Sequence, residues 1–594
     1  MKHFRKLFAL VLALALILSA VSFARAEAAL KTITILGTTD LHGNIWGYSY
    51  EDNKETANNG MARVYTYVEQ VRAETPNVIL LDAGDTVQGT IMTDDLYNKE
   101  EGEHPVITAM NLMGYDAMTL GNHEFNFGVD LVARLQKLAN FPLLSANTTV
   151  AATGEKFVDA YTIVERDGVR VAVIGVTTPN IPVWDGDKVA TLAFEGMSSA
   201  VKRTIEAIGD QADVLVVCAH AGQFAVFDED NGTDAANKIL EDNPEIDVLM
   251  VGHMHVTVND KSGKTLIGGA RNGGREVVRF DLTIGADNKV TDGAVSVVDM
   301  ADVTPSEALR ADEFIKTAHQ RTIDFIQGSG SAEGGAAGGI FGQASARFQP
   351  EDEIKGIPEG KLRDTAVMDL INKVQLLNSG ADVSAAALFK DTSDIPAGDI
   401  NYGTIFNIYK FDNTLYRVTV TGAELKAYME WSAACYNGYT EGDLNVSFNP
   451  EKPGYLYDMF AGVDYKIDLS KPAGERIVDV MFKGEPLQDD QTLTLAVNNY
   501  RYSSALKQYN LVSGKREWES AGSIRDMLVK YITEQDTITP EVDNNWEIIG
   551  VNFDSPYREA LIEKINAGEI ETPYAKSLNV NDEAVKAIID TLKK

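Results

Sequence analysis

Residues 32–44 read TITILGTTDLHGN, a short apolar run that ends in a group of polar side chains. Its length and its content of Thr and Ile favour a buried β-strand. Asp40, His42 and Asn44 follow within a few residues of the strand's predicted end. The stretch therefore predicts a strand that delivers carboxylate, imidazole and amide groups to one place.

The same pattern recurs along the first half of the chain. Apolar runs that predict buried strands lie at residues 32–36, 78–81, 117–120, 169–174, 214–217 and 248–251. The polar segments that follow five of them are DLHGN (40–44), DAGD (82–85), GNHE (121–124), AHAG (219–222) and GHMH (252–255). Loops at the carboxyl ends of strands in an α/β sheet converge on one face, so we expect these segments to share a cleft.

The side chains in these segments indicate a metal site. Five of the chain's eight histidines lie there. Asp, His and Asn supply the oxygen and nitrogen ligands that suit Zn, Mn, Fe or Co, and the absence of thiolates argues against a structural zinc site. A lone histidine after a strand is usually an ordinary loop residue, but five in series point to metal binding.

The composition limits which kinds of partner the protein can bind. The formal net charge is −34 at pH 7, which repels nucleic-acid backbones and anionic membranes. A small anionic substrate would need a concentrated local positive charge, which metal ions supply. We therefore expect no nucleic-acid polymer as partner, and the oligomeric state stays open.

The first residues predict export. Lys2, Arg5 and Lys6 form a basic start, residues 7–23 are apolar, and Ala24-Arg25-Ala26 is typical of a cleavage site. This pattern predicts a secretory signal peptide over residues 1–26, with an uncleaved anchor as the alternative. We expect a secreted protein (periplasmic, cell-wall-associated or extracellular) that does not attach to the membrane after cleavage. Cys218 and Cys435 lie in contexts that give no reason to pair them.

Alternating strands and helices over residues 31–303 predict a layered α/β domain, with helices at 61–73 and 129–138. Residues 304–340 predict a linker, because Thr304, Pro305 and Glu307 form a capping box for a helix to about residue 327, before a Gly-rich stretch at 328–339. Residues 341–550 predict a second, mixed α/β domain. Its predicted helices lie at 365–379 and 422–434, and its strands at 415–420, 463–468 and 492–497. Residues 551–594 form a charged, partly helical tail without an assigned role.

The ordered set DLHGN, GD, GNHE, AH and GHxH resembles the calcineurin-like metallophosphoesterases. From about Lys31 to Gly550, the chain resembles the two-domain bacterial nucleotidase family. That resemblance implies an α/β protein whose first domain is a β-sandwich flanked by helices and whose second is a smaller α/β substrate-binding domain. It also implies two divalent metal ions. One would be held by Asp40, His42, Asp85 and His255, and the other by Asp85, Asn122, His220 and His253.

The resemblance implies a catalytic role for His123 and Asn126. His123 would contact the phosphoryl oxygen or protonate the leaving group. In the 5′-nucleotidase and nucleotide-sugar hydrolase members an aspartate pairs with this histidine, whereas Asn126 can orient it only by a hydrogen bond. GNHEFN instead resembles the 2′,3′-cyclic-nucleotide 2′-phosphodiesterase/3′-nucleotidase branch, as do segments 179–185 and 458–465. The alternative is that Asn126 has drifted neutrally.

The family also implies an aromatic clamp for the base in the second domain. Phe411 and Tyr500 occupy the matching places, and stacking on them would tolerate different bases. The family's Gly-Gly stretch after the second aromatic residue is absent here, where residues 502–505 read YSSA. Lys390 and Arg363 are further candidates for phosphate or ribose contacts, although such charges are more often simply solvated.

We therefore expect a dinuclear-metal hydrolase that converts 2′,3′-cyclic nucleotides to 3′-nucleotides and then to nucleosides and phosphate. The nearest alternative is 5′-nucleotidase or nucleotide-sugar hydrolase activity at the same site. More distant alternatives are a thiohydrolase of the same superfamily and a surface protein that binds without catalysis. The complete set of candidate metal ligands argues against the last.

Overall fold

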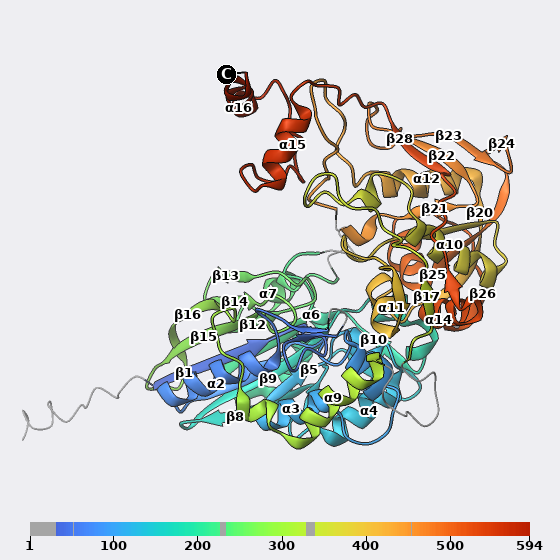
Figure 1. Ribbon diagram of the computed structural model, residues 1–594. Coiled ribbons are helices and arrows are strands. Elements are labelled where there is room, and N and C mark those ends of the chain that lie inside the picture. Colours follow the sequence, from blue (N-terminus) through green and yellow to red (C-terminus); the bar gives the residue numbers. More distant parts are fainter. Residues whose placement is uncertain (1–30, 51–52, 226–232, 328–338, 453, 594) are drawn as a thin grey trace, which may run out of the picture. The chain divides into compact units, whose positions relative to one another are not determined.

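The computed structural model describes residues 31–593 except 51–52, 226–232, 328–338 and 453 (Figure 1). The predicted signal peptide, 1–26, and nearly all of the predicted Gly-rich stretch lie outside the described residues. The chain divides into two compact units. The first comprises Met1–Tyr48 and Lys54–His319, and the second comprises Ser49–Asn53 and Gln320–Lys594.

Two six-stranded sheets form the first unit. One has the order β16-β15-β1-β4-β5-β6, and the other β13-β14-β12-β11-β9-β8. The strands of the first sheet are β1 (Lys31–Thr38), β4 (Val78–Asp82), β5 (Ala117–Thr119), β6 (Leu143–Leu144), β15 (Glu276–Ile284) and β16 (Val290–Asp299). Those of the second are β8 (Tyr161–Arg166), β9 (Val169–Thr177), β11 (Val214–His220), β12 (Val248–Val251), β13 (Val258–Ser262) and β14 (Thr265–Gly269). All six strands predicted from sequence are present, and the ends of five of them differ from the prediction by one to three residues.

The central strands of each sheet run parallel, which brings their carboxyl ends to one edge. β1 pairs with β4 in the register Thr38↔Asp82, and β4 pairs with β5 in the register Asp82↔Met118. β9, β11 and β12 pair in parallel in the other sheet. Because parallel strands end together, the polar segments that follow them leave the sheets at neighbouring points.

Apolar side chains from both sheets meet face to face. Ile33, Ile79 and Leu81 of the first sheet share a buried cluster with Val171 and Val216 of the second. The outer face of the second sheet packs against α6 (Met197–Ile208) and α7 (Asn237–Asp242). Helices α2 (Met61–Glu74), α3 (Pro105–Met113) and α4 (Val129–Leu138) lie side by side on the first sheet (Figure 1). This is the layered sandwich flanked by helices that the sequence predicted.

The second unit is also mixed α/β. Its main sheet has the order β21-β18-β25-β20-β26. These strands are β18 (Val383–Ala386), β20 (Thr414–Thr421), β21 (Met459–Ala461), β25 (Thr492–Asn498) and β26 (Arg516–Ser523). A four-stranded sheet contains β22 (Asp464–Asp468), β23 (Ile477–Phe482), β24 (Glu485–Pro486) and β28 (Trp546–Ile549). Helices α10 (Ala366–Ser379), α11 (Tyr402–Ile408), α12 (Gly422–Ala433) and α14 (Ile524–Gln535) complete its core.

The C-terminal tail belongs to this second unit. It forms α15 (Arg558–Asn566) and α16 (Glu583–Leu592). Leu561, Val585 and Ile589 pack in one buried cluster with Leu444. Arg558 adds a two-bond ion pair with Glu353, at 2.6 and 2.7 Å. The few apolar residues of the tail therefore pack it against the rest of the second unit.

The prediction of one continuous helix from Thr304 to residue 327 is wrong. Two helices occupy this segment, α8 (Glu307–Arg310) and α9 (Glu313–Gln327). Ser306 caps the first, because its Oγ accepts the Leu309 N–H at 3.3 Å. Asp312 caps the second, because its Oδ1 accepts the N–H groups of Phe314 and Ile315 at 3.1 and 3.0 Å. Asp312 lies six residues after Ser306 and caps a new helix, so the segment forms two helices instead of one.

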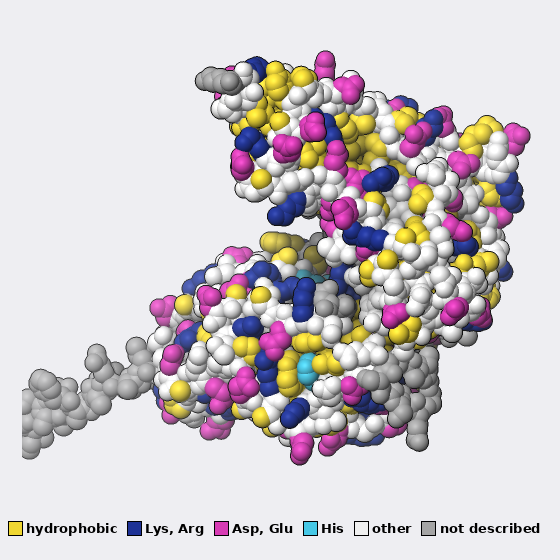
Figure 2. All heavy atoms as spheres, viewed as in Figure 1, with side chains coloured by type: hydrophobic (Ala, Val, Ile, Leu, Met, Phe, Trp, Pro, Cys, Tyr) yellow, Lys and Arg dark blue, Asp and Glu magenta, His cyan; other side chains and the backbone are white. Residues whose placement is uncertain are grey.

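Both cysteines, Cys218 and Cys435, are buried and free. Every helix in the described residues is too short or too polar to span a bilayer. Acidic and basic side chains are interspersed on the visible faces of the units (Figure 2).

Three carboxylates crowd together in the second unit and generate a prediction about stability. Burial and the charge of Asp364 raise the pKa of Asp369 to about 7, and burial and the charge of Asp543 raise that of Asp364 to about 6. A carboxyl whose pKa is higher in the folded state than in the unfolded state costs stability as pH rises. Here the loss begins near the ordinary pKa and is complete above about pH 7.

Asp369→Asn should therefore raise the unfolding temperature at pH 8 and leave it unchanged near pH 4. The amide oxygen can still accept the Asp543 N–H, which Asp369 Oδ2 accepts at 3.0 Å. The measurement is thermal unfolding of wild type and variant in chelator at both pH values. Exposed Asp490→Asn is the matched control. Equal unfolding temperatures at pH 8 would show that the crowding costs nothing.

Candidate metal centre

The structure places the predicted metal ligands at the ends of five strands in the first unit. Asp40 and His42 follow β1, Asp85 follows β4, and Asn122 follows β5. His220 is the last residue of β11, and His253 and His255 follow β12. The side chains form two groups whose possible ligand atoms lie within 4.8 Å of one another, Asp40/His42/His255 and Asp85/His220/His253.

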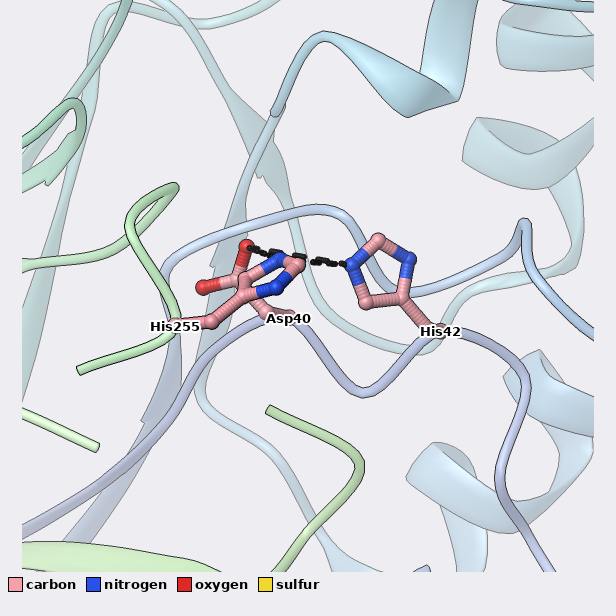
Figure 3. Close-up of side chains that lie close together, drawn as sticks. All are labelled: Asp40, His42 and His255. Carbon is pink, nitrogen blue, oxygen red and sulfur yellow. Dashed lines mark hydrogen bonds and ion pairs between the residues drawn. The ribbon is translucent and has the colours of Figure 1, made fainter. Parts of the chain in front are cut away.

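The first group converges on Asp40 Oδ1 (Figure 3). His255 Nε2 lies 3.2 Å from this oxygen, and His42 Nε2 lies 3.0 Å from His255 Nε2. His42 Nδ1 donates to the Gln88 carbonyl at 2.9 Å, which leaves the Nε2 lone pair of a neutral ring facing the group. A backbone carbonyl behind the ring is the usual support of a metal-binding histidine.

The second group has the same arrangement. His220 Nδ1 donates to the Ala83 carbonyl at 2.7 Å. On the other side of the ring, His220 Nε2 lies 3.0 Å from Asp85 Oδ2 and 3.2 Å from Asn122 Oδ1. His253 contacts the His220 ring edge-on, with centroids 5.2 Å apart. The predicted position of Asp85 between two ions stays a prediction.

This donor set fits divalent cations. Asp40 Oδ1 is buried without a hydrogen-bond partner, a costly state unless a cation completes it. Carboxylate oxygens, an amide oxygen and imidazole nitrogens face one another, and few of these atoms carry a hydrogen to donate. Oxygen and nitrogen donors of this kind suit Zn, Mn, Fe or Co.

The pKa shifts describe the metal-free chain. Burial alone would lower the pKa of His220, but the charge and hydrogen bond of Asp85 raise it to about 10. Burial lowers the pKa of His42 and that of His253 to about 3. Burial would raise the pKa of Asp40, but the nearby His255 ring and the charge of His220 lower it to about 2. A proton on His220 thus takes the place of a cation, and metal binding must release it.

Five of the candidate ligands have a left-handed backbone. Their φ angles are 53° for Asp40, 49° for His42, 58° for Asp85, 73° for His253 and 58° for His255. This conformation is uncommon for residues other than glycine. Backbone strain concentrated in this way is typical of functional sites.

Glu124, which the sequence did not mark as a site residue, organises two of the loops. Its buried carboxylate accepts N–H groups from Asp85 (2.9 Å), Thr86 (2.7 Å), Val87 (3.3 Å) and Gly121 (2.7 Å). Gly121 must be glycine, because an added Cβ would lie 2.3 Å from Asp85 Oδ1. The only indication of this role in the sequence is the acidic residue within the GNHE segment.

His123 lies beside the ligand groups. Its Nε2 is 3.9 Å from Asp85 Oδ2, and its backbone N–H donates to Asp85 Oδ1 at 2.7 Å. Asn126 Oδ1 lies 2.6 Å from His123 Nδ1, as the sequence predicted for an orienting amide. Burial lowers the pKa of His123, but Asp85 and Asn126 raise it by more. Asn126 in turn contacts Asp185, a carboxylate that the sequence did not connect to this site.

In the second unit, Phe411 and Tyr500 lie at the same end of a strand pair. β20 and β25 pair with Leu415 opposite Asn498, so Phe411 and Tyr500 both lie beyond the same end of this strand pair. Tyr500 is 38% exposed, and Phe411 packs edge-on against Phe389 at 5.1 Å. An exposed ring at such an edge can stack on a base.

Buried arginines anchor both aromatic segments. Arg501 pairs with Asp458 at 2.7 Å, beside Tyr500. Arg525 donates to the Lys410 carbonyl at 2.7 Å, beside Phe411. Neither arginine was predicted, since their roles depend on partners distant in sequence.

The two remaining substrate-binding candidates are Lys390 and Arg363. Lys390 follows Phe389 in the chain, and the ring of Phe389 contacts that of Phe411. Arg363 is exposed and pairs with Glu359 at 3.0 Å. Asp364, Asp369 and Asp543 form a third group of possible metal ligands, also in the second unit.

Comparisons with known proteins agree with this geometry. The calcineurin-like phosphoesterase family model matches residues 33–257, and the 5′-nucleotidase C-terminal domain model matches residues 349–512. The trifunctional nucleotide phosphoesterase YfkN of Bacillus subtilis is 29% identical over 88% of this chain, which spans 39% of that protein's length. The 2′,3′-cyclic-nucleotide 2′-phosphodiesterase/3′-nucleotidase of Yersinia enterocolitica is 27% identical over 92% of both chains.

Solved structures share the fold. A Staphylococcus aureus structure assigned as a 5′-nucleotidase has a TM-score of 0.74 at 22% identity, covering 87% of this chain and 100% of that one. The 5′-nucleotidase precursor of Thermus thermophilus has a TM-score of 0.60 at 22% identity, covering 88% and 100%. The chain is a metal-dependent phosphoesterase and belongs to the family that joins a calcineurin-like phosphoesterase domain to a 5′-nucleotidase C-terminal domain.

Proposed function

We propose that this enzyme converts 2′,3′-cyclic nucleotides to 3′-nucleotides and then to nucleosides and phosphate at one metal centre. The observation that carries the proposal is the Asn126 amide, 2.6 Å from His123, where the 5′-nucleotidase members have a carboxylate. The relative matched over 92% of both chains carries the name of this activity. The proposal includes export, on the basis of the predicted signal peptide.

Two ligand sets would hold two divalent ions of Zn, Mn, Fe or Co. The first is Asp40, His42, Asp85 and His255, and the second is Asp85, Asn122, His220 and His253. Bound there, such ions would neutralise phosphoryl charge and lower the pKa of an attacking water.

The chain's own groups then divide the remaining work. Asn126 holds His123 through Nδ1, so the Nε2 side faces Asp85 and the ligand groups. From that position the protonated ring, which carries a hydrogen on each nitrogen, can donate its Nε2–H to a phosphoryl oxygen or to the leaving oxygen. Both reactions displace an oxygen from phosphorus in line and develop charge on the same oxygens, so one positive site serves both.

Phe411 and Tyr500 would stack on the base of the nucleotide. Stacking requires only a flat π-face, so we propose little preference among bases. Lys390, which follows Phe389 in the chain, would contact the ribose or phosphate. Arg363 is the weakest of these assignments, because it is already paired with Glu359.

The second candidate is 5′-nucleotidase activity. Protein UshA of Yersinia enterocolitica is 25% identical over 79% of this chain and 84% of its own. The 5′-nucleotidase of Vibrio vulnificus is 24% identical over 85% of this chain and 90% of its own. The Asp185 carboxylate behind Asn126 favours this candidate, because it places a negative charge one amide away from His123.

Substrate preference tests the proposal directly. We expect kcat/KM to be higher for 2′,3′-cyclic AMP and 3′-AMP than for 5′-AMP, with all activity lost in chelator. The measurement is kcat/KM for the three substrates under one metal condition, since this ratio reports discrimination between transition states. A preference for 5′-AMP of about tenfold, or about 1.4 kcal/mol, would establish the second candidate instead.

His123→Ala should keep the metal content of the wild type and lower kcat by about 10²–10⁴-fold, the range typical of an acid-base group. The His123 side chain contacts Asp85 and Asn126. Metal analysis of the purified variant serves as the control. Wild-type turnover, or loss of bound metal, would be incompatible with the proposed role.

Asp85→Asn should lower metal occupancy at both ligand groups, because Asp85 is proposed to bridge them. Its Oδ2 lies 3.0 Å from His220 Nε2. Inductively coupled plasma analysis measures the metal bound per chain, and exposed Asp292→Asn is the matched control. If the Asp85 variant binds as much metal as the control, Asp85 does not bridge.

A further inference from the structure

Asp185 lies behind the Asn126 amide, at the C-terminal end of α5 (Ile181–Asp185). Its carboxylate is buried and accepts from Asn126 Nδ2, with Oδ1 at 3.0 Å and Oδ2 at 3.3 Å. Asn126 Oδ1 lies 2.6 Å from His123 Nδ1. The three side chains form a continuous hydrogen-bonded series from a buried carboxylate to the imidazole beside the metal ligands.

The carboxylate determines which way the amide turns. An ionised carboxylate can only accept hydrogen bonds, so it requires the NH₂ side of Asn126. The amide oxygen must then face His123 and can itself only accept, so His123 Nδ1 must carry a hydrogen. The other ring nitrogen, Nε2, is left on the side of Asp85, 3.9 Å from its Oδ2.

The segment that carries Asp185 holds Asn126 in a second way. Lys188 Nζ donates to the Asn126 backbone carbonyl at 2.6 Å and lies 3.9 Å from Asp185 Oδ1. Burial raises the pKa of Asp185, and the Lys188 charge and the Asn126 hydrogen bond oppose the rise. Trp184 of the same helix packs against the candidate ligand His253, with ring centroids 5.6 Å apart.

We propose that Asp185 is a positioning residue that fixes the orientation and tautomer of His123 through Asn126. The proposal rests on the catalytic role proposed above for His123. In this arrangement two residues share the two tasks that a single carboxylate performs when it contacts a histidine directly. Asn126 supplies the acceptor, and Asp185, one amide further away, ensures that the acceptor is what His123 meets.

Asp185→Asn tests this inference. The new amide accepts or donates equally well, so the Asn126 amide loses its single preferred direction. We expect kcat to fall by about 10–100-fold, the range for residues that orient active-site groups from behind, while KM changes little. Steady-state kinetics with bis(p-nitrophenyl) phosphate, which has no base, and with 3′-AMP give both parameters without and with base recognition.

The exchange variant, Asn126→Asp with Asp185→Asn, separates positioning from a general structural role. It returns a carboxylate to the series, now in direct contact with His123, and the amide introduced at position 185 can donate to that carboxylate. Its kcat should exceed that of either single variant, since Asn126→Asp alone places two carboxylates side by side. Exposed Asp187→Asn, two residues from Asp185, is the control and should keep wild-type kinetics.

Metal content and unfolding temperature are measured for every variant, with His123→Ala in parallel. Wild-type kcat in Asp185→Asn, or an exchange variant no better than both single variants at equal metal content, would overturn the inference. If His123→Ala also keeps its activity, the proposed role of His123 fails as well. If His123→Ala is inactive and Asp185→Asn is normal, only the positioning role fails.

Discussion

The arrangement of the metal centre depends on one buried carboxylate that binds no metal. Glu124 accepts four backbone N–H groups from two loops, one after β4 and one after β5. Burial and the nearby charge of Asp85 raise the pKa of Glu124, and the hydrogen bonds from the backbone of Thr86 and Asp85 oppose that rise only in part. Holding these loops at fixed separation places Asp85 beside Asn122 and His123, before any ligand is present.

The sandwich supplies the conditions for that contact. Parallel pairing aligns the carboxyl ends of β1, β4 and β5, and the second sheet brings β11 and β12 to the same centre. Apolar side chains of the two sheets pack against one another in a buried cluster. At the strand ends, the carbonyls of Ala83 and Gln88 orient the imidazoles of His220 and His42. The stable core and the reactive edge are thus separate parts of one fold.

Much of this could be predicted from sequence, because strand runs and the polar segments after them are local signals. Residues 248–251 and 129–138 were predicted with the observed ends of β12 and α4. The restart of the helix at Asp312 was missed, since two caps competed. The roles of Glu124, Asp185 and Arg525 could not be predicted, because each acts on a partner brought close only by folding. The left-handed φ angles likewise follow from loop geometry rather than residue type.

Those left-handed φ angles affect how substitutions at the centre should be interpreted. Asparagine and aspartate tolerate this conformation, whereas alanine has no polar side chain to stabilise it. Alanine at residue 40, 42, 85, 253 or 255 would therefore combine the loss of a ligand with a change in loop conformation. An alanine scan would overstate the contribution of these side chains to metal affinity. Asparagine keeps the backbone preference, so it changes the charge and type of the ligand atom while the loop conformation is kept.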